Sequence, residues 1–224
     1  MGLPNPDPSL AGGMNYVWGR PTTGPGLSPF GTPNLGMQID AFLACERAFH
    51  GNELIIFQAG NNDLNVGRLP SFTAFGLGAI ANDFEDDITE LAHVGCKYFL
   101  VTKLGASYRQ PSLAGTSYGN RLRHEFAALN QLLGQRLTKL AKELGVTIAM
   151  FEYDSVAEAV VADRGLYGLE NVDAGYFTSP DEGLAAGGDP DTFFWWDDFH
   201  LTRTAHAIVG KAAAEFVNEV FAAP

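Results

Sequence analysis

Apolar residues recur with a helical period in three stretches of the chain, and each stretch precedes a short apolar run. The helical spacing predicts amphipathic helices over residues 35–49, 77–91 and 122–144. The apolar runs are typical of buried strands and lie at Leu54–Phe57, Tyr98–Val101 and Val146–Phe151. A last helical stretch follows His200. This alternation predicts an α/β fold with a parallel sheet that helices cover on both faces.

Two segments rich in turn-forming residues interrupt this pattern. Pro21–Pro33 is rich in Gly, Pro, Ser and Thr, and Phe177–Pro190 is rich in Gly, Asp and Ala, so we expect no regular structure in either. A further strand-like run, Asn15–Gly19, precedes the first segment. With 224 residues, 46% of them hydrophobic, the chain can bury one sizeable core, and we expect residues 1–224 to form a single domain.

The chain is acidic, with a formal net charge of −12 and scattered basic residues. This disfavours nucleic acid and anionic membranes as partners, because both bind concentrated positive surfaces. Cys45 and Cys96 lie in or beside apolar segments, which indicates buried thiols and no disulfide framework. No stretch has the length of a membrane span, and the first residues lack a signal-peptide pattern, so we expect a soluble chain. The compartment stays open, because a lost upstream segment would take a secretion signal with it.

An Asp-x-x-His segment, Asp197 to His200, lies between an aromatic run and the last helical stretch. An aspartate at this spacing can orient a histidine that acts as a general base. The alternative is a solvated loop with an incidental histidine. His206 also suggests a metal site with His200, but a separation of six residues does not place both on one helical face, so we expect no metal. Neither a P-loop nor a dinucleotide-binding glycine turn occurs, so we expect no cofactor.

Two further segments carry groups that suit an oxyanion. The strand at Leu54 runs into Gly60–Asp63, where the side-chain amide of Asn62 would donate to a substrate oxygen. Gly19 ends the Asn15 run, and its backbone N–H would approach a substrate closely because no Cβ intervenes. Gly60–Asp63 also fits a plain turn, since Gly, Asn and Asp tolerate the dihedral angles of turns.

These segments resemble the sequence blocks of the SGNH/GDSL hydrolase family, which surround a serine, a glycine, an asparagine and a histidine. The glycine block is similar to Asn15–Thr23, the Gly-x-Asn-Asp block to Gly60–Asp63, and the Asp-x-x-His block to Asp197–His200, in the family's order. Arg20 and Pro21 stand where the family usually has small residues. The resemblance implies a three-layer α/β/α flavodoxin-like fold and a GDSL-type esterase or lipase that acts on small-molecule or lipid esters.

The resemblance also implies a role for each site residue. In such a hydrolase a serine attacks the acyl carbon, His200 takes the serine's proton, Asp197 holds the imidazole, and Asn62 with Gly19 stabilises the oxyanion.

The family's nucleophile, a Gly-Asp-Ser block on the first strand, is absent from these 224 residues. Ser9 fits a turn beside Pro8, and the remaining serines lack the strand-to-helix context of a nucleophile. Three hypotheses follow. The chain is an ester hydrolase whose N-terminal segment is missing from the sequence, a catalytically inactive relative that binds a ligand, or an enzyme with a substitute nucleophile or a water activated by His200.

The missing block also removes an inner strand from the flavodoxin-like order 2-1-3-4-5, and leaves a gap between the Asn15 and Leu54 strands. We expect the chain to bring these strands together, to pair with a strand of a partner such as a second copy, or to aggregate through the exposed edge. We also expect Gly19, Asn62, Asp197 and His200 to converge on one cleft, with the His200 imidazole within about 10 Å of the Asn62 amide.

Overall fold

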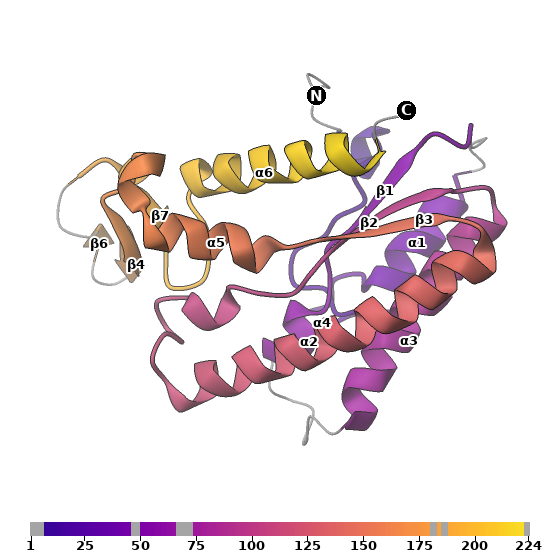
Figure 1. The fold of residues 1–224 in the computed structure, drawn as a ribbon, viewed down its shortest axis with the longest axis horizontal. Helices are drawn as coiled ribbons and strands as arrows, with labels where there is room; N and C mark the ends of the chain where they lie inside the picture. The colour runs from indigo at the N-terminus through magenta and orange to yellow at the C-terminus, as the bar shows by residue number, and fades with distance from the viewer. Residues whose placement is uncertain (1–6, 46–49, 66–73, 180–182, 185–187, 222–224) are drawn as a thin grey trace. The chain divides into compact units, whose positions relative to one another are not determined.

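The computed structural model describes residues 7–45, 50–65, 74–179, 183–184 and 188–221 (Figure 1). Its contacts divide the chain into two compact units. Unit 1 contains Met1–Leu104 and Glu125–Met150, and unit 2 contains Gly105–His124 and Phe151–Pro224. The single domain expected over residues 1–224 stays a prediction.

Unit 1 is built around a three-stranded parallel sheet with the order β1-β2-β3 (Figure 1). The strands are β1 (Leu54–Phe57), β2 (Tyr98–Thr102) and β3 (Thr147–Phe151), which confirms the three strands predicted from the apolar runs. β1 and β2 pair in register from Leu54 opposite Tyr98 to Phe57 opposite Val101. The central strand β2 buries Phe99, Leu100 and Val101 in succession, as a strand covered on both faces does.

The helices of the predicted apolar stripes are α1 (Leu35–Leu43), α3 (Ala74–His93) and α4 (Ser117–Leu144), and a short α2 (Asn61–Asn65) follows β1. The stripes of α3 and α4 are buried at Ile80, Phe84, Ile88, Leu91, Leu122, Phe126, Leu129, Leu133, Leu137 and Leu140. Phe84 packs against Phe57 of β1, with ring centroids 6.1 Å apart. Gly145 has φ +67 and ends α4, as predicted. α1 ends at Leu43, so the helix predicted over residues 35–49 is shorter than expected, and residues 46–49 lie outside the described residues.

Unit 2 has a smaller core made by two helices and a pair of strands. The helices are α5 (Tyr153–Ala162) and α6 (Arg203–Phe221), and β4 (Asn171–Gly175) pairs in parallel with β7 (Phe193–Trp195). The indole N–H of Trp195 donates to the Val172 carbonyl at 3.0 Å and so ties β7 to β4. The buried core residues are Ala106, Ala157, Val160, Leu169, Val172, Phe194, Trp195 and Ala205. None of the described helices has both the length and the apolar composition that crossing a membrane requires.

The expected strand at Asn15–Gly19 is not formed. Asn15 makes only an isolated bridge with Pro8, and its backbone N–H and C=O bond to Asp7 and Ser9 at 3.0 and 2.8 Å. These backbone groups therefore turn back on the preceding residues and do not pair with β1. The prediction was wrong because an apolar run becomes a strand only where a second backbone satisfies its polar groups.

The two turn-rich segments differ from each other. Pro21–Pro33 contains no helix or strand apart from an isolated bridge between Leu27 and Pro33, as expected. In Phe177–Pro190, by contrast, β5 (Phe177–Ser179) pairs antiparallel with β6 (Gly183–Leu184), so the expectation of irregular structure was wrong there. Local composition does not show that these two short runs lie opposite each other.

β1 is an edge of the described sheet, because no described strand pairs with its other side. A cavity of about 420 Å³ lies against this strand, and its lining includes Met14–Val17, Ile39 and Phe42 of α1, and Glu53–Gln58. Ile56 of β1 is 61% exposed. The Asn15 run therefore lies near β1 without joining the sheet, and closure of the gap by these two segments does not occur among the described residues.

α3 carries a row of carboxylates, of which Asp87 is buried. The Oδ2 atom of Asp87 is shielded from solvent and has no hydrogen-bond partner among the described residues. Burial, with the charges of Asp83 and Glu90 as smaller causes, raises the pKa of Asp87 to about 7. The fold therefore favours the protonated form of this side chain.

We predict that Asp87→Asn stabilises the chain at pH 8 and has little effect at pH 4. Because the folded pKa of about 7 exceeds the ordinary value of 3.8, the contribution of Asp87 to stability is complete below pH 3.8 and is lost as the pH rises through 7. Discounted for solvent screening, the gain at pH 8 is about 2 kcal/mol, measured by urea unfolding. Asp86→Asn, at an exposed neighbour, is the control. Equal gains at both pH values would contradict the argument.

Candidate active site

The loop between β7 and α6 carries Asp197 and His200. The Trp196 N–H donates to the His200 carbonyl at 2.7 Å and closes this loop. At the far end, the Thr202 hydroxyl donates to the Phe193 carbonyl at 2.6 Å. The loop is therefore closed between Trp196 and His200 and is fixed to β7 at Thr202, just before α6 begins.

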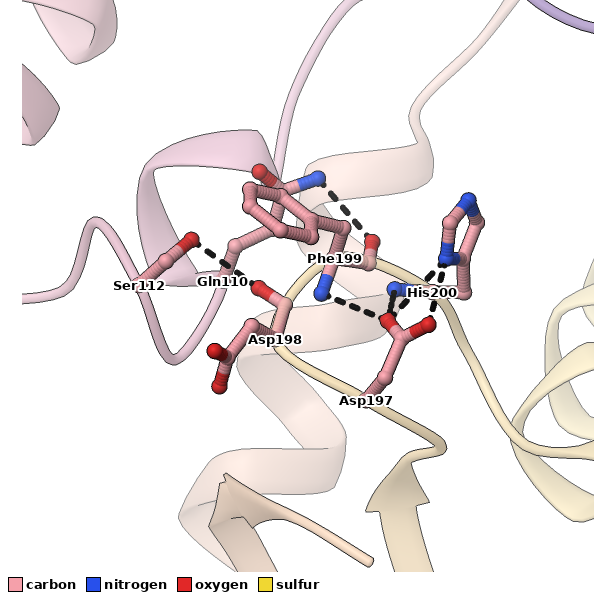
Figure 2. A network of polar contacts seen from close by, with 6 residues as sticks. All are labelled: Gln110, Ser112, Asp197, Asp198, Phe199 and His200. Atoms are coloured by element: carbon pink, nitrogen blue, oxygen red, sulfur yellow. Dashed lines mark hydrogen bonds and ion pairs between the residues drawn. The ribbon is translucent and has the colours of Figure 1, made fainter. Parts of the chain in front are cut away.

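The Asp197 carboxylate organises the interior of the loop (Figure 2). Its Oδ1 accepts the backbone N–H of Phe199 at 2.8 Å and of His200 at 2.7 Å. The Nδ1 atom of His200 lies 2.8 Å from Oδ2 and 3.0 Å from Oδ1 of the same carboxylate. One side chain thus fixes both the backbone turn and the imidazole ring.

The ionisation of Asp197 decides which imidazole nitrogen carries a hydrogen. Burial acts to raise the pKa of Asp197, but hydrogen bonds from His200 and Phe199 outweigh burial and hold the pKa below its ordinary value. An ionised carboxylate only accepts hydrogen bonds, so Nδ1 donates, and Nε2 of the neutral ring holds the free lone pair. The His200 side chain is 75% exposed, which leaves Nε2 open to a substrate. This is the arrangement that a general base needs.

Gly175, the last residue of β4, lies against the backbone of Asp197. A Cβ at position 175 would be 2.7 Å from the Asp197 carbonyl carbon and 2.9 Å from its Cα, closer than non-bonded carbon atoms approach. Glycine at this position therefore allows the site loop to lie on β4. No local pattern marks Gly175, because this contact joins segments that are separated along the chain.

Aromatic residues pack together in the part of unit 2 that precedes and includes the Asp197–His200 loop. Trp196 is 42% exposed and stacks on Phe177, with an interplanar angle of 15° and centroids 6.1 Å apart. Tyr176 lies on the same indole, 5.7 Å between centroids. Phe199 is 54% exposed, and its ring lies 6.5 Å from that of His200. Exposed aromatic residues therefore lie on the loop that carries the candidate base.

In unit 1 the structure brings the Asn62 and Gly19 segments together. Gly60 takes φ +103 after β1, and α2 begins at the next residue. The Asn62 side-chain amide donates to the Pro21 carbonyl at 2.8 Å. This bond uses one of the two amide hydrogens and leaves the second for a ligand. Gly19 is two residues before Pro21, so the segment that carries Gly19 lies beside Asn62.

The backbone around Gly19 shows no close contact that would require a glycine there. A Cβ at Gly19 would meet no atom within 4 Å, so its surroundings do not require glycine. Arg20, which stands where the family usually has a small residue, takes the left-handed φ of +66. Its guanidinium carbon lies 5.1 Å from the centre of the Phe30 ring, a cation–π contact to the turn-rich segment that follows.

Thr23 is a buried residue that links the segment of Gly19 to the segment of Asn62. Its role was not predicted from the sequence. Its hydroxyl lies 2.9 Å from Asp63 Oδ1 and 2.6 Å from Asp83 Oδ2, and its backbone N–H also donates to the Asp63 carboxylate. A hydroxyl has one hydrogen, so the second carboxyl must carry a proton to bond with it. Burial is the largest cause that raises the pKa of both Asp63 and Asp83. The sequence signal that could have indicated this contact is that Thr23 and Asp63 each end one of the two blocks, Asn15–Thr23 and Gly60–Asp63.

No described serine side chain shows a hydrogen bond to a histidine. Ser112 donates to a backbone carbonyl at 3.0 Å, and Ser28 pairs with Thr32 at 2.7 Å. Ser9 lies in a short 3₁₀ helix, which agrees with the turn predicted for it. Ser71 lies outside the described residues. The contacts of the described serines therefore single out none as an activated nucleophile.

The four predicted site residues belong to different units. Gly19 and Asn62 lie in unit 1, and Asp197 and His200 lie in unit 2. Asp197 is bonded to His200, and Asn62 is bonded beside the Gly19 segment. Convergence of all four residues on one cleft stays a prediction.

An α/β fold with a parallel sheet, and a carboxylate that orients an exposed histidine, are features of hydrolases that use a general base. The chain matches the model of the GDSL-like lipase/acylhydrolase family over residues 2–213, and it therefore belongs to this family. This confirms the resemblance inferred from the three sequence blocks, and the described sheet is consistent with a flavodoxin-like fold. No curated protein matches the chain.

We predict that Gly175→Ala displaces the Asp197 loop and lowers the free energy of unfolding by about 2 kcal/mol, because the added Cβ overlaps the Asp197 backbone. Gly210→Ala is the matched control. It lies within α6, where a Cβ meets no atom within 4 Å, and we expect a gain of about 0.5–1 kcal/mol from helix propensity. Urea unfolding measures both changes. Parental stability of Gly175→Ala would show that the close approach does not require glycine.

Proposed function

We propose that this chain carries the acid–base and oxyanion groups of a GDSL-type carboxylic ester hydrolase. The observation that carries the proposal is the Asp197–His200 pair, in which the carboxylate holds Nδ1 and leaves Nε2 exposed. Membership of the acylhydrolase family supports the reaction class. We assign Asn62 and Gly19 as the oxyanion donors, on the basis of the family's sequence blocks and the unused amide hydrogen of Asn62.

In the proposed reaction the nucleophile's oxygen forms a bond to the acyl carbon while its proton moves to Nε2 of His200. The carbonyl π electrons move onto oxygen, where the Asn62 amide and the Gly19 N–H donate to the new charge. Asp197 stabilises the imidazolium. His200 then gives its proton to the departing alkoxide, and a water activated in the same way releases the acid and restores the nucleophile.

We propose that the nucleophilic serine is not among these 224 residues, because the sequence has no Gly-Asp-Ser block. Translation of the coding sequence upstream of Met1 tests this directly. An in-frame Gly-Asp-Ser within several tens of codons supports an incomplete hydrolase, whereas an immediate stop codon contradicts it and favours an inactive relative or a substitute nucleophile.

For the substrate we propose a small-molecule or lipid ester. Trp196 and Phe199 are exposed residues of the loop that carries the base, and we expect them to cover an apolar acyl or alcohol group. The formal net charge of −12 opposes anionic ligands, which agrees with a neutral ester.

A second candidate function is binding of such a ligand without hydrolysis. The absence of Gly-Asp-Ser and of any described serine–histidine bond favours it. Calorimetry with an ether analogue of a short aryl ester, which no nucleophile can cleave, tests binding. Saturable heat that Trp196→Ala abolishes supports this function if the chain shows no turnover, and the absence of such heat contradicts it.

We predict that the purified chain hydrolyses p-nitrophenyl acetate slowly or not at all. Removal of one triad member typically leaves an enhancement of about 10³–10⁴ over the reaction in water, so any activity stays near that level. His200→Ala should lower such residual activity, while His206→Ala, at an exposed position of α6, should leave it unchanged. A turnover of about 1–10³ s⁻¹ that His200→Ala abolishes would contradict the missing nucleophile.

We also propose that the open edge of β1 associates with a second copy of the chain. The strand Leu54–Phe57 has no charged residue, and uncovered edges of this kind invite pairing. We predict that the chain elutes above its monomer mass and that the apparent mass rises with concentration. Ile56→Lys should shift the chain toward monomer. Val94→Lys, which changes an exposed apolar residue elsewhere in the same unit, is the control and should cause no shift. Size-exclusion chromatography with light scattering measures this. A monomer at all concentrations would contradict the proposal.

A further inference from the structure

The turn that carries His200 lies at the surface, so packing does little to hold it. The side chain of His200 is 75% exposed and Phe199 is 54% exposed. Exposed loops with few buried contacts open locally at a low free-energy cost. A base on such a loop needs other interactions to keep one geometry, since small displacements of a catalytic group are costly to the rate.

Two side chains of another loop bind the carbonyl groups of this turn (Figure 2). The Gln110 side-chain amide donates to the Phe199 carbonyl at 3.0 Å, and the Ser112 hydroxyl donates to the Asp198 carbonyl at 3.0 Å. Figure 2 shows Gln110 and Ser112 on one side of the turn and the carboxylate of Asp197 on the other. Both donors belong to unit 2, like the turn itself.

These bonds complete the hydrogen bonding of two successive peptide groups. The peptide between Asp198 and Phe199 donates its N–H to Asp197 and accepts at its C=O from Ser112. The peptide between Phe199 and His200 donates its N–H to Asp197 and accepts at its C=O from Gln110. In each of the two peptide groups that precede the His200 side chain, both the N–H and the C=O are therefore hydrogen-bonded.

The loop that carries these donors is itself anchored to α5. The Asp154 carboxylate accepts the Ala106 N–H at 3.1 Å and the Tyr108 hydroxyl at 3.0 Å. Ala106 takes the left-handed φ of +60, and a Cβ at Gly105 would lie 2.7 Å from the Asp154 Cβ. These contacts hold the start of the loop against α5, and thereby help to fix the position of Gln110.

We propose that Gln110 and Ser112 are positioning residues for His200. They hold the peptide groups of Asp198–Phe199 and Phe199–His200, and thereby keep the Asp197 carboxylate and the imidazole in one relative geometry. Neither donor bonds to the imidazole, so both act through the turn. The proposal rests on the proposed role of His200 as the base.

The experiment compares Gln110→Glu, Ser112→Ala and their combination with the parent chain. Gln110→Glu keeps the side-chain shape but removes the donor, and Ser112→Thr keeps the hydroxyl. Gln131→Glu, at an exposed position of α4, is the matched control for the added charge. The first readout is hydrogen exchange at the Phe199 and His200 amides. We expect exchange to rise about five-fold for each lost bond and to return to the parental rate in Ser112→Thr.

The second readout is the pair of imidazole ¹⁵N shifts of His200, which report the nitrogen that carries the hydrogen. We expect Nδ1 to carry it in the parent and the two nitrogens to become more alike in the double variant, while the melting temperature changes little. Unchanged exchange and shifts in the double variant would overturn the proposal. So would an equal rise in exchange across all of unit 2, because that result indicates general destabilisation. Neither readout requires turnover. If the chain hydrolyses no ester, the proposed function is contradicted, but this test of Gln110 and Ser112 can still be made.

Discussion

The candidate site depends on one carboxylate, that of Asp197. It accepts two backbone N–H groups and the Nδ1 of His200, so the same oxygens form the turn and orient the base. Backbone geometry and ring orientation are therefore coupled, and a change in one disturbs the other. Gly175 extends this constraint to β4, because its lack of a Cβ lets the strand pass directly beside the loop.

The balance between burial and hydrogen bonding differs among the carboxyl groups of this chain, and their pKa values differ with it. Asp197 has three donors, and they outweigh its burial and lower its pKa. Asp63 accepts the Thr23 N–H as well as the hydroxyl that it shares with Asp83, but burial prevails and raises the pKa of both carboxyls. Asp87 Oδ2 has no donor among the described residues, and its pKa rises to about 7. Hydrogen bonds thus favour the ionised form of the carboxyl that holds the turn of the candidate base, whereas burial favours the protonated form of Asp87.

The open edge of β1 and the missing nucleophile have a common explanation in our proposal. We propose that the nucleophilic serine belongs to a strand beside β1, where no described strand pairs. One absent strand would account for the exposed Ile56, the cavity of about 420 Å³ beside β1 and the lack of Gly-Asp-Ser. The Asn15 run does not replace that strand, because its backbone groups bond to Asp7 and Ser9.

Local periodicity and local spacing were enough to predict several parts of this protein from its amino acids. The stripes of α3 and α4 and the three strand runs have fixed periods, and Asp197 reaches His200 within a single turn. Three features became visible with the folded chain: the Asn15 run stays outside the sheet, Gly175 makes room for Asp197, and Thr23 bonds to Asp63 and Asp83. The reason is physical: these outcomes depend on which backbone or carboxylate from a distant segment arrives beside the residue, and no local pattern encodes that partner.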